Sequence, residues 1–264
     1  MDVALGSEVF RLLSFEEACR QAAALGYRAL GLHTRREYDP HVFPPRCRGA
    51  ELKRVKQALE ENRLCVSSIR SFANIALDEE LERVEHELAL ARELCCPVVL
   101  LGSPAPRAPL ASIERMKSFR QKQAERLRAL AERAAEAGVT LCLATAPGAF
   151  FESTLELGEF LRLVGHPRAR FALCTAEVLR CGESLDAAFD AAGDLLGHVS
   201  VADVKLSSGG RRVPLGRGEV KLSRLLELLR AEEYEGFLEV DLAGCEGEAL
   251  AAARESIEQL KRLL

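Results

Sequence analysis

The sequence predicts an α/β protein, a single (β/α)8 TIM barrel domain over residues 1–264. Segments with helical periodicity, rich in Ala, Leu, Glu and Arg, alternate with short apolar runs along the whole chain. Runs such as VVLL (98–101) and LCLA (141–144) are continuously apolar, which is typical of parallel strands buried on both faces. The length of 264 residues suits an eight-unit barrel, which needs about 250 residues.

Each expected strand is a short apolar run bounded by glycine or polar residues. Eight runs qualify, at residues 3–6, 28–33, 64–69, 97–102, 139–145, 170–175, 197–204 and 236–242. Eight amphipathic segments lie between or after them, at about 14–25, 49–62, 79–94, 110–137, 153–164, 183–195, 220–233 and 247–263. The first helix opens with a capping box, Ser14 and Glu17.

Three turns from helix to strand contain a glycine where a helix end favours a left-handed residue. They are Leu25-Gly26-Tyr27, Ala137-Gly138-Val139 and Glu235-Gly236-Phe237. The alternative fold is an open doubly wound sheet. It fits less well because LGSEVF (5–10) has one glycine where the phosphate-binding GxGxxG loop needs three.

The composition excludes several classes of partner. A net charge of −4 with 29% charged residues and no dense Lys/Arg run argues against nucleic acid and anionic membranes. No apolar run reaches the roughly 18 residues needed to span a bilayer, and no basic and hydrophobic leader opens the chain. The nine cysteines are scattered and fit neither a disulfide framework nor zinc-ligand spacing. We therefore expect the protein in the cytoplasm, with reduced thiols.

In a barrel, the site is expected where the strands end, beside the long loops 34–48, 104–120 and 205–219. The polar candidates at those positions are His33, Arg70, Ser71, Ser103, Thr145, Thr175, Glu177, Asp203, Lys205 and Asp241, with Arg211, Arg212 and Arg217 from the seventh loop.

Three of these candidates are carboxylates on neighbouring strands: Glu177, Asp203 and Asp241. They are expected either to hold a hard cation or act as acid and base, or simply to pair with arginines. Asp241 is the strongest, because it interrupts an apolar run where an unpaired charge is costly. Cys174 is either a nucleophile or, as we expect in the absence of an evident histidine base, a buried inert thiol.

Five long segments carry a resemblance to a known family. They are FEEACRQAAALGYRALGL, ELKRVKQALEENRLCVSS, LERVEHELALARELCCPVVLLGSP, RLRALAERAAEAGVTLCLA and VPLGRGEVKLSRLLELLRAEEYEGFLEVDL. Together they resemble the xylose-isomerase-like TIM barrel superfamily of sugar phosphate isomerases and epimerases over nearly the whole chain. PLGRGEV and YEGFLEVDL are the most specific parts. The resemblance implies a metal-assisted 1,2-proton or hydride shift on a ketose or aldose, and frequent dimerisation.

The resemblance also implies four metal ligands, one on each of strands 5 to 8, and this sequence departs from them. The glutamate, aspartate, histidine and glutamate fall at Ala144, Cys174, Ser200 and Asp241. The histidine that usually faces the substrate falls at Glu177, while the aspartate after the strand 7 histidine is kept as Asp203. No residue is therefore assigned as a metal ligand. Mn²⁺, Mg²⁺, Zn²⁺ or Co²⁺ is expected only if the site has moved to Glu177, Asp203 and Asp241.

Two functions remain open. In the first, the protein is an isomerase, epimerase or lyase with a degenerate metal site that acts on a small polyhydroxy or keto compound, either without a metal or with an ion moved toward Glu177, Asp203 and Asp241, and Glu177 and Asp241 are catalytic. In the second, it is a catalytically inactive barrel that binds a small sugar-like ligand or a partner protein. The residues expected to bind the substrate are His33, Thr145, Asp203, Lys205 and Arg217. A homodimer is the assembly that the resemblance suggests.

Overall fold

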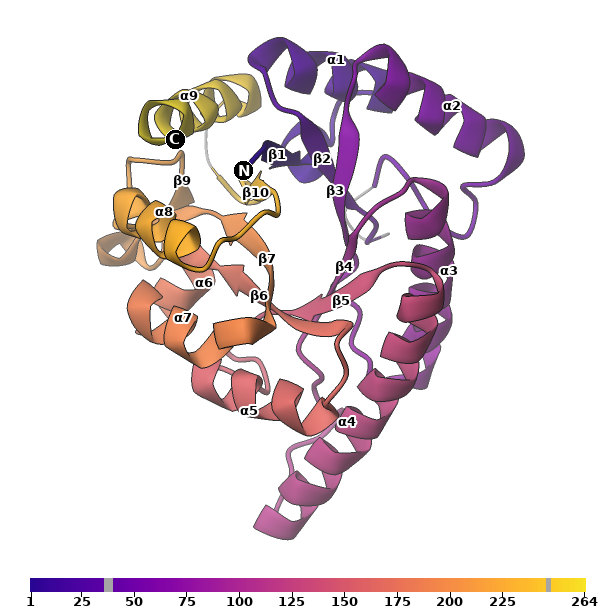
Figure 1. The fold of residues 1–264 in the computed structure, drawn as a ribbon, viewed down its shortest axis with the longest axis vertical. Coiled ribbons are helices and arrows are strands. Elements are labelled where there is room, and N and C mark those ends of the chain that lie inside the picture. The colour runs from indigo at the N-terminus through magenta and orange to yellow at the C-terminus, as the bar shows by residue number, and fades with distance from the viewer. Residues whose placement is uncertain (36–39, 246–247) are drawn as a thin grey trace.

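The computed structural model describes residues 1–35, 40–245 and 248–264 and forms a closed barrel of parallel strands (Figure 1). The strand order around the barrel is β1-β10-β7-β6-β5-β4-β3-β2. The strands are β1 Val3–Gly6, β2 Ala29–His33, β3 Cys65–Arg70, β4 Val98–Leu101, β5 Thr140–Leu143, β6 Ala169–Cys174, β7 Leu196–Val201 and β10 Leu238–Val240. The expected (β/α)8 barrel is confirmed.

The helices form an outer ring around the strands (Figure 1). The long ones are α1 Phe15–Leu25, α2 Gly49–Glu61, α3 Asp78–Glu93, α4 Ile113–Glu136, α5 Thr154–Val164, α7 Leu185–Ala192, α8 Leu222–Ala231 and α9 Ala249–Leu263. Their amphipathic faces pack on the strands in one continuous apolar core. Short elements add detail at the strand ends: the 3-10 helices η1 Ser7–Phe10, η3 Gly193–Leu195 and η4 Leu206–Ser208, and the helix α6 Thr175–Arg180.

The seventh strand is shorter than the sequence suggested. It ends at Val201, and Asp203–Lys205 form β8, which pairs antiparallel with β9, Arg211–Val213. The physical reason is the carboxylate of Asp203, which accepts hydrogen bonds from the backbone amides of Val204, Gly216, Gly218 and Val220. A Cβ atom at Gly218 would lie 2.2 Å from Asp203 Oδ1. The second glycine of PLGRGEV, Gly218, is thus required for this turn.

Two of the three expected glycine helix ends are confirmed. Gly26 and Gly138 have φ of 93° and 73°, in the left-handed region that suits glycine. The third was wrong, because the left-handed residue after α8 is Glu233, with φ of 50°. Gly236 instead leaves room for the ring of Tyr234, whose hydroxyl would lie 2.3 Å from an added Cβ. The cap of α1 is confirmed, since Ser14 Oγ accepts from the amide of Glu17 at 3.2 Å.

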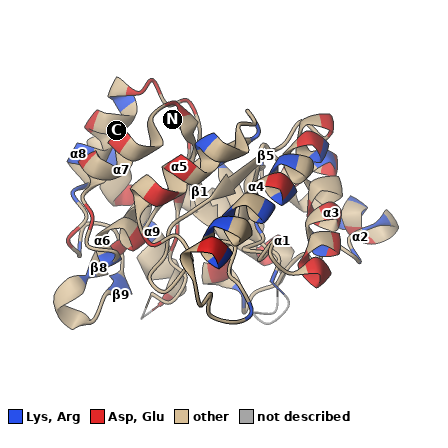
Figure 2. Cartoon of the chain, turned by 90° about the horizontal axis from the view of Figure 1, so that it is seen from below, with Lys and Arg blue, Asp and Glu red and all other residues tan. Residues whose placement is uncertain are grey.

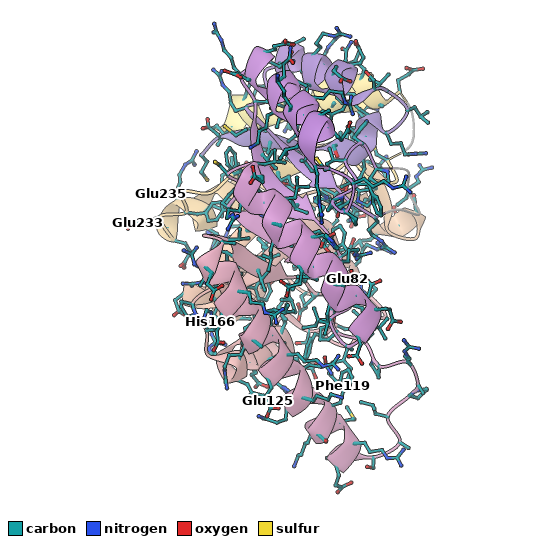
Figure 3. The ribbon with its side chains drawn as sticks, turned by 90° about the vertical axis from the view of Figure 1, so that its right-hand side faces the viewer. Glu82, Phe119, Glu125, His166, Glu233 and Glu235 are labelled. Carbon is teal, nitrogen blue, oxygen red and sulfur yellow. The ribbon has the colours of Figure 1, made fainter. Side chains whose placement is uncertain are left out.

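The outer surface is polar and mixed in charge. Figure 2 shows basic and acidic residues interspersed over the helices. Figure 3 shows α3 and α4 lying across one side of the barrel, with the labelled Phe119 near the protruding start of α4. His166, also labelled there, lies in the turn before β6, and its Nδ1 accepts from the Arg168 amide at 3.1 Å. Within the described residues, no helix is long and apolar enough to cross a membrane. Cys19, Cys47, Cys96 and Cys142 are buried free thiols.

Candidate functional site

A buried arginine, Arg70 at the end of β3, organises the mouth of the barrel. Its side chain is 3% exposed, and each guanidinium nitrogen faces a different carboxylate. Nε lies 2.6 Å from Glu8 Oε1, Nη1 2.5 Å from Glu239 Oε1 and Nη2 2.8 Å from Asp241 Oδ2. These carboxylates come from the loop after β1 and from β10 and its end. Since β10 lies next to β1 in the barrel, distant parts of the sequence meet on one side chain.

Glu239 is the most deeply buried of these carboxylates, and neighbouring side chains bind it. Its Oε2 accepts hydrogen bonds from Ser67 Oγ at 2.7 Å and Ser68 Oγ at 2.6 Å. Two consecutive serines can point inward because the pairing of β2 with β3 shifts register between Leu30 and Gly31. A Cβ at Gly31 would lie 2.4 Å from the Glu239 carboxylate. The glycine, the irregular strand and the serines together accommodate a charge inside the barrel.

Burial by itself raises the pKa of Glu239, but His198, Arg70 and the two serines outweigh it, so the pKa lies below its usual value. Glu239 is therefore ionised. His198 Nε2 lies 3.9 Å from Glu239 Oε1 and 3.2 Å from Ser200 Oγ. Burial lowers the pKa of His198, which keeps this ring neutral near neutral pH.

Asp241 is shared by two arginines. Its Oδ2 lies 2.8 Å from Arg70 Nη2 and 2.6 Å from Nη1 of Arg212, on β9. Arg212 Nη2 in turn lies 2.7 Å from Glu177 Oε1, on α6. Burial raises the pKa of Asp241, but Arg212 and Arg70 together lower it well below its ordinary value. Asp241 is a permanent anion that fixes both guanidinium groups.

Glu8 lies between Arg70 and His33. Its Oε1 is 2.6 Å from Arg70 Nε and 3.5 Å from His33 Nδ1. Its Oε2 is buried and has no hydrogen-bond partner among the residues that the structure describes. The side chain fits because β1 ends in Gly6, where an added Cβ would lie 2.7 Å from Oε2. Burial raises the pKa of Glu8 more than Arg70 lowers it, so Glu8 holds a proton more readily than an ordinary glutamate.

A cavity of about 740 Å³ opens over this cluster. Its lining includes Glu8, His33, Arg70, Phe72, Arg212 and Asp241, and its volume is in the range of small-molecule sites. Phe72 has a left-handed φ of 50°, which is strained for a bulky residue, and its ring centroid lies 5.3 Å from the Arg70 guanidinium carbon. The mouth thus combines fixed cations, a proton carrier and an aromatic face.

The structure brings together only some of the residues selected from the sequence. His33, Arg70, Arg212 and Asp241 line the cavity, and Glu177 contacts it through Arg212. The other expected substrate-binding residues do not line it. Thr145 is buried, Asp203 holds the seventh loop, Lys205 is exposed, and Arg217 pairs with Glu255 on the surface.

Three members of the cluster were missed: Glu8, His198 and Glu239. The sequence held a signal for two of them, since His198 and Glu239 each interrupt an apolar strand two residues before an inward-facing position, Ser200 and Asp241. No comparable signal marks Glu8. Cys174 lies at the mouth, and burial raises the pKa of its thiol to about 12, which supports the expected inert thiol.

The residues present do not fit the family's metal ion. Ala144 offers no ligand atom, Cys174 stays a neutral thiol, and Ser200 contacts His198. The remaining ligand position, Asp241, has two guanidinium nitrogens on one oxygen. In the described ranges, no group of three or more His, Cys, Asp or Glu side chains is arranged to hold a metal. Glu177, Asp203 and Asp241 do not come together as a relocated metal site in these ranges, because the carboxylate of Asp203 accepts hydrogen bonds from the amides of the seventh loop.

A closed eight-stranded barrel with its polar cluster at the carboxyl ends of the strands defines a TIM barrel protein. The family model described as xylose isomerase-like TIM barrel matches residues 19–263, so the chain belongs to that family. No curated protein matches the sequence.

Solved structures share the fold at low sequence identity. The probable 3-DHS dehydratase AsbF of Bacillus anthracis has a TM-score of 0.82 and 16% identity, over 99% of both chains. A xylose isomerase domain protein of Alicyclobacillus acidocaldarius has a TM-score of 0.81 and 18% identity, over 100% of this chain and 98% of that one. The 3-keto-D-glucoside 4-epimerase YcjR of E. coli has a TM-score of 0.81 and 19% identity, over 99% of both chains. Identities this low support the fold and not the activity.

Proposed function

We propose that the protein is an isomerase or epimerase of small polyhydroxy or keto compounds that works without a metal ion. The observation that carries this proposal is the pair of guanidinium groups on Asp241 Oδ2, at 2.8 Å from Arg70 and 2.6 Å from Arg212. These fixed cations stand at the one acidic ligand position that the chain retains. Fixed cations can stabilise the negative oxygen of an enediolate, as a divalent ion would.

The proton-transfer group in this proposal is Glu8. It lines the cavity, and within residues 1–35, 40–245 and 248–264 its Oε2 has no hydrogen-bond partner. A carboxyl group whose pKa is raised toward the working pH can both accept and donate a proton. In its ionised form, Glu8 would take the proton from the hydroxyl-bearing carbon next to the carbonyl group, and the electron pair would move to the carbonyl oxygen to give an enediolate. The proton of the neighbouring hydroxyl group would pass to that oxygen, and return of the carbon-bound proton from Glu8 to the former carbonyl carbon would interconvert ketose and aldose. Return to the original carbon on the opposite face would give the epimer.

The experiment is deuterium exchange in D2O, followed by proton NMR on a panel of ketoses and small hydroxyketones after the protein has been treated with a chelator. The wild type should exchange the hydrogen on the carbon next to the carbonyl group for deuterium. Glu8→Gln should slow this at least about a hundredfold, the usual contribution of a positioned acid or base. Glu232→Gln, at an exposed position after α8, serves as the control. Exchange that requires an added metal contradicts the proposal.

The second candidate is a barrel that binds a ligand without chemistry. It is favoured by the saturation of Arg70, since all three of its nitrogens already face protein carboxylates. A saturated guanidinium has less to offer a ligand than an open one. Binding of panel compounds with no exchange in any of them would select this function.

A further inference from the structure

Glu87 on α3 is a buried carboxylate that takes no part in the proposed reaction. Its side chain is 0% exposed, and among the residues that the structure describes its Oε2 has no hydrogen-bond partner. Burial raises the pKa of Glu87 more than hydrogen bonds from Ser71 and Thr34 lower it. An apolar side chain of similar size would avoid the cost of burying this group. Stability alone therefore does not explain a glutamate here.

The carboxylate of Glu87 joins the ends of two neighbouring strands. Its Oε1 accepts a hydrogen bond from Thr34 Oγ1 at 2.7 Å, and Ser71 is its second hydroxyl partner. Thr34 directly follows β2, and Ser71 directly follows β3. Both residues are completely buried. One side chain of a helix thus bridges two strand ends.

Arg83, one turn before Glu87 on α3, strengthens this bridge. Its Nη2 donates to the carbonyl oxygen of Ser71 at 3.0 Å, and its Nε lies 3.7 Å from Glu87 Oε1. The hydroxyl oxygen of Ser71 also accepts from the amide of Ala73 at 3.1 Å. Both the hydroxyl group and the carbonyl group of Ser71 are therefore held by α3.

The residues that precede the bridged pair line the cavity at the mouth. Successive side chains of a strand point to opposite faces, so Thr34 and Ser71 face the helix. Their neighbours His33 and Arg70 face the cavity. The register of β2 with β3 runs up to the pair of His33 and Arg70, and the end of a pairing opens more easily than its middle. Glu87 extends the connection by one residue, where it protects this last pair.

We propose that Glu87 is a positioning residue of the candidate site. It holds the ends of β2 and β3 together from behind, so that the guanidinium group of Arg70 keeps its place among its three carboxylates. The inference rests on the proposed function for the reaction that Arg70 serves. The position of Arg70 itself can be tested without a substrate.

Arginine side-chain NMR measures this position. The Nε–H of Arg70 donates to Glu8 Oε1 at 2.6 Å, and its signal is assigned through the backbone resonances of the same residue. Glu87→Gln keeps one acceptor oxygen for Thr34, whereas Glu87→Met has a similar size and keeps none. Hydrogen exchange of the Nε–H should become about threefold faster in Glu87→Gln. It should become at least about tenfold faster in Glu87→Met, as expected when hydrogen bonds to a charged group are lost.

Two further variants make this measurement decisive. Glu85→Gln is the matched control, because Glu85 lies on the same helix but pairs with Arg133 at the surface, and its Nε–H exchange should equal that of the wild type. Thr34→Val removes one donor without a change in α3 and should also speed the exchange, so the test stands even if a Glu87 variant does not fold. Wild-type exchange rates in Glu87→Met or in Thr34→Val would overturn the inference.

The reaction gives a second readout. Because a displaced Arg70 stabilises the enediolate less, Glu87→Met should lower kcat for deuterium exchange about tenfold and change KM by less than about twofold. A residue that only fills space would leave kcat unchanged in a folded variant, and that result would also overturn the inference. If the wild type exchanges no deuterium, the proposed function fails, whereas faster Nε–H exchange in the variants would still support the role of Glu87. The two failures are therefore distinguishable.

Discussion

Arg212 and Asp241 meet at the mouth of the barrel, where Nη1 of the arginine lies 2.6 Å from Oδ2 of the aspartate. The arginine comes from the hairpin after β7 and the aspartate from the end of β10, so the pair attaches the seventh loop to the eighth strand. Because Arg70 contacts the same oxygen at 2.8 Å, one carboxylate fixes two cations from different loops. The rigidity of the candidate site depends on Asp241.

Asp241→Asn should therefore be strongly destabilising. Loss of one partner from a buried ion pair typically costs about 3–5 kcal/mol. We expect about 3 kcal/mol here, at the lower end of that range, because the amide oxygen of asparagine can still accept a hydrogen bond from a guanidinium group. Urea denaturation measures this as a lower midpoint.

Asp186→Asn is the matched control, because Asp186 pairs with Arg224 on the surface and such pairs contribute about 1 kcal/mol or less. Equal losses in the two variants would mean that Asp241 is not held as the structure shows.

Glu8 should make stability depend on pH. Burial raises its pKa above the usual 4.5, so the folded protein binds a proton that the unfolded chain releases first. This contribution is fully present below 4.5 and is lost as the pH rises through the raised value. In that interval, the free energy of unfolding should fall by up to about 1.4 kcal/mol per pH unit relative to Glu8→Gln.

Thermal melts of the wild type and Glu8→Gln from pH 4 to 8 test this. Both proteins keep Glu87, whose pKa is also raised by burial, so the difference between them isolates Glu8. Parallel curves at all pH values would show that Glu8 is an ordinary ionised carboxylate.

Most of the fold could be predicted from the sequence, because each strand and helix has a local pattern. The exceptions depend on contacts between distant residues. The early end of β7 follows from the convergence of four amides on Asp203, one from the next residue, Val204, and three from a later loop. Likewise, the left-handed residue after α8 is Glu233. The glycine that suggested a helix end, Gly236, has a different role, because it leaves room for the ring of Tyr234.

The candidate site could be predicted only where a charge interrupts an apolar strand. Asp241 was found for that reason, and the expectation that it needs a partner is confirmed by its two arginines. Glu239 shows the same interruption two residues earlier. Glu8 could not be found, because its role depends on Arg70, a residue far along the chain, and on the space that Gly6 leaves.

Arg212 lies between two carboxylates that could otherwise share a metal ion. Arg212 bridges two carboxylates, at 2.6 Å to Asp241 and 2.7 Å to Glu177. Arg212→Met removes the cation between them and leaves two carboxylates without their shared partner. Since a hard divalent ion prefers such oxygens, Mn²⁺ should raise the melting temperature of this variant by several degrees, while the wild type should not respond.

Elemental analysis of the purified wild type and variant completes the test. Arg217→Met is the control, because Arg217 pairs with Glu255 at the exposed surface, away from the cavity lining. A stoichiometric ion in the wild type would mean that the guanidinium groups do not stand in for the metal. If the melting temperature of Arg212→Met does not respond to Mn²⁺, Arg70 alone is sufficient to exclude the metal ion. In that variant Arg70 still contacts the same oxygen of Asp241 and repels a second cation.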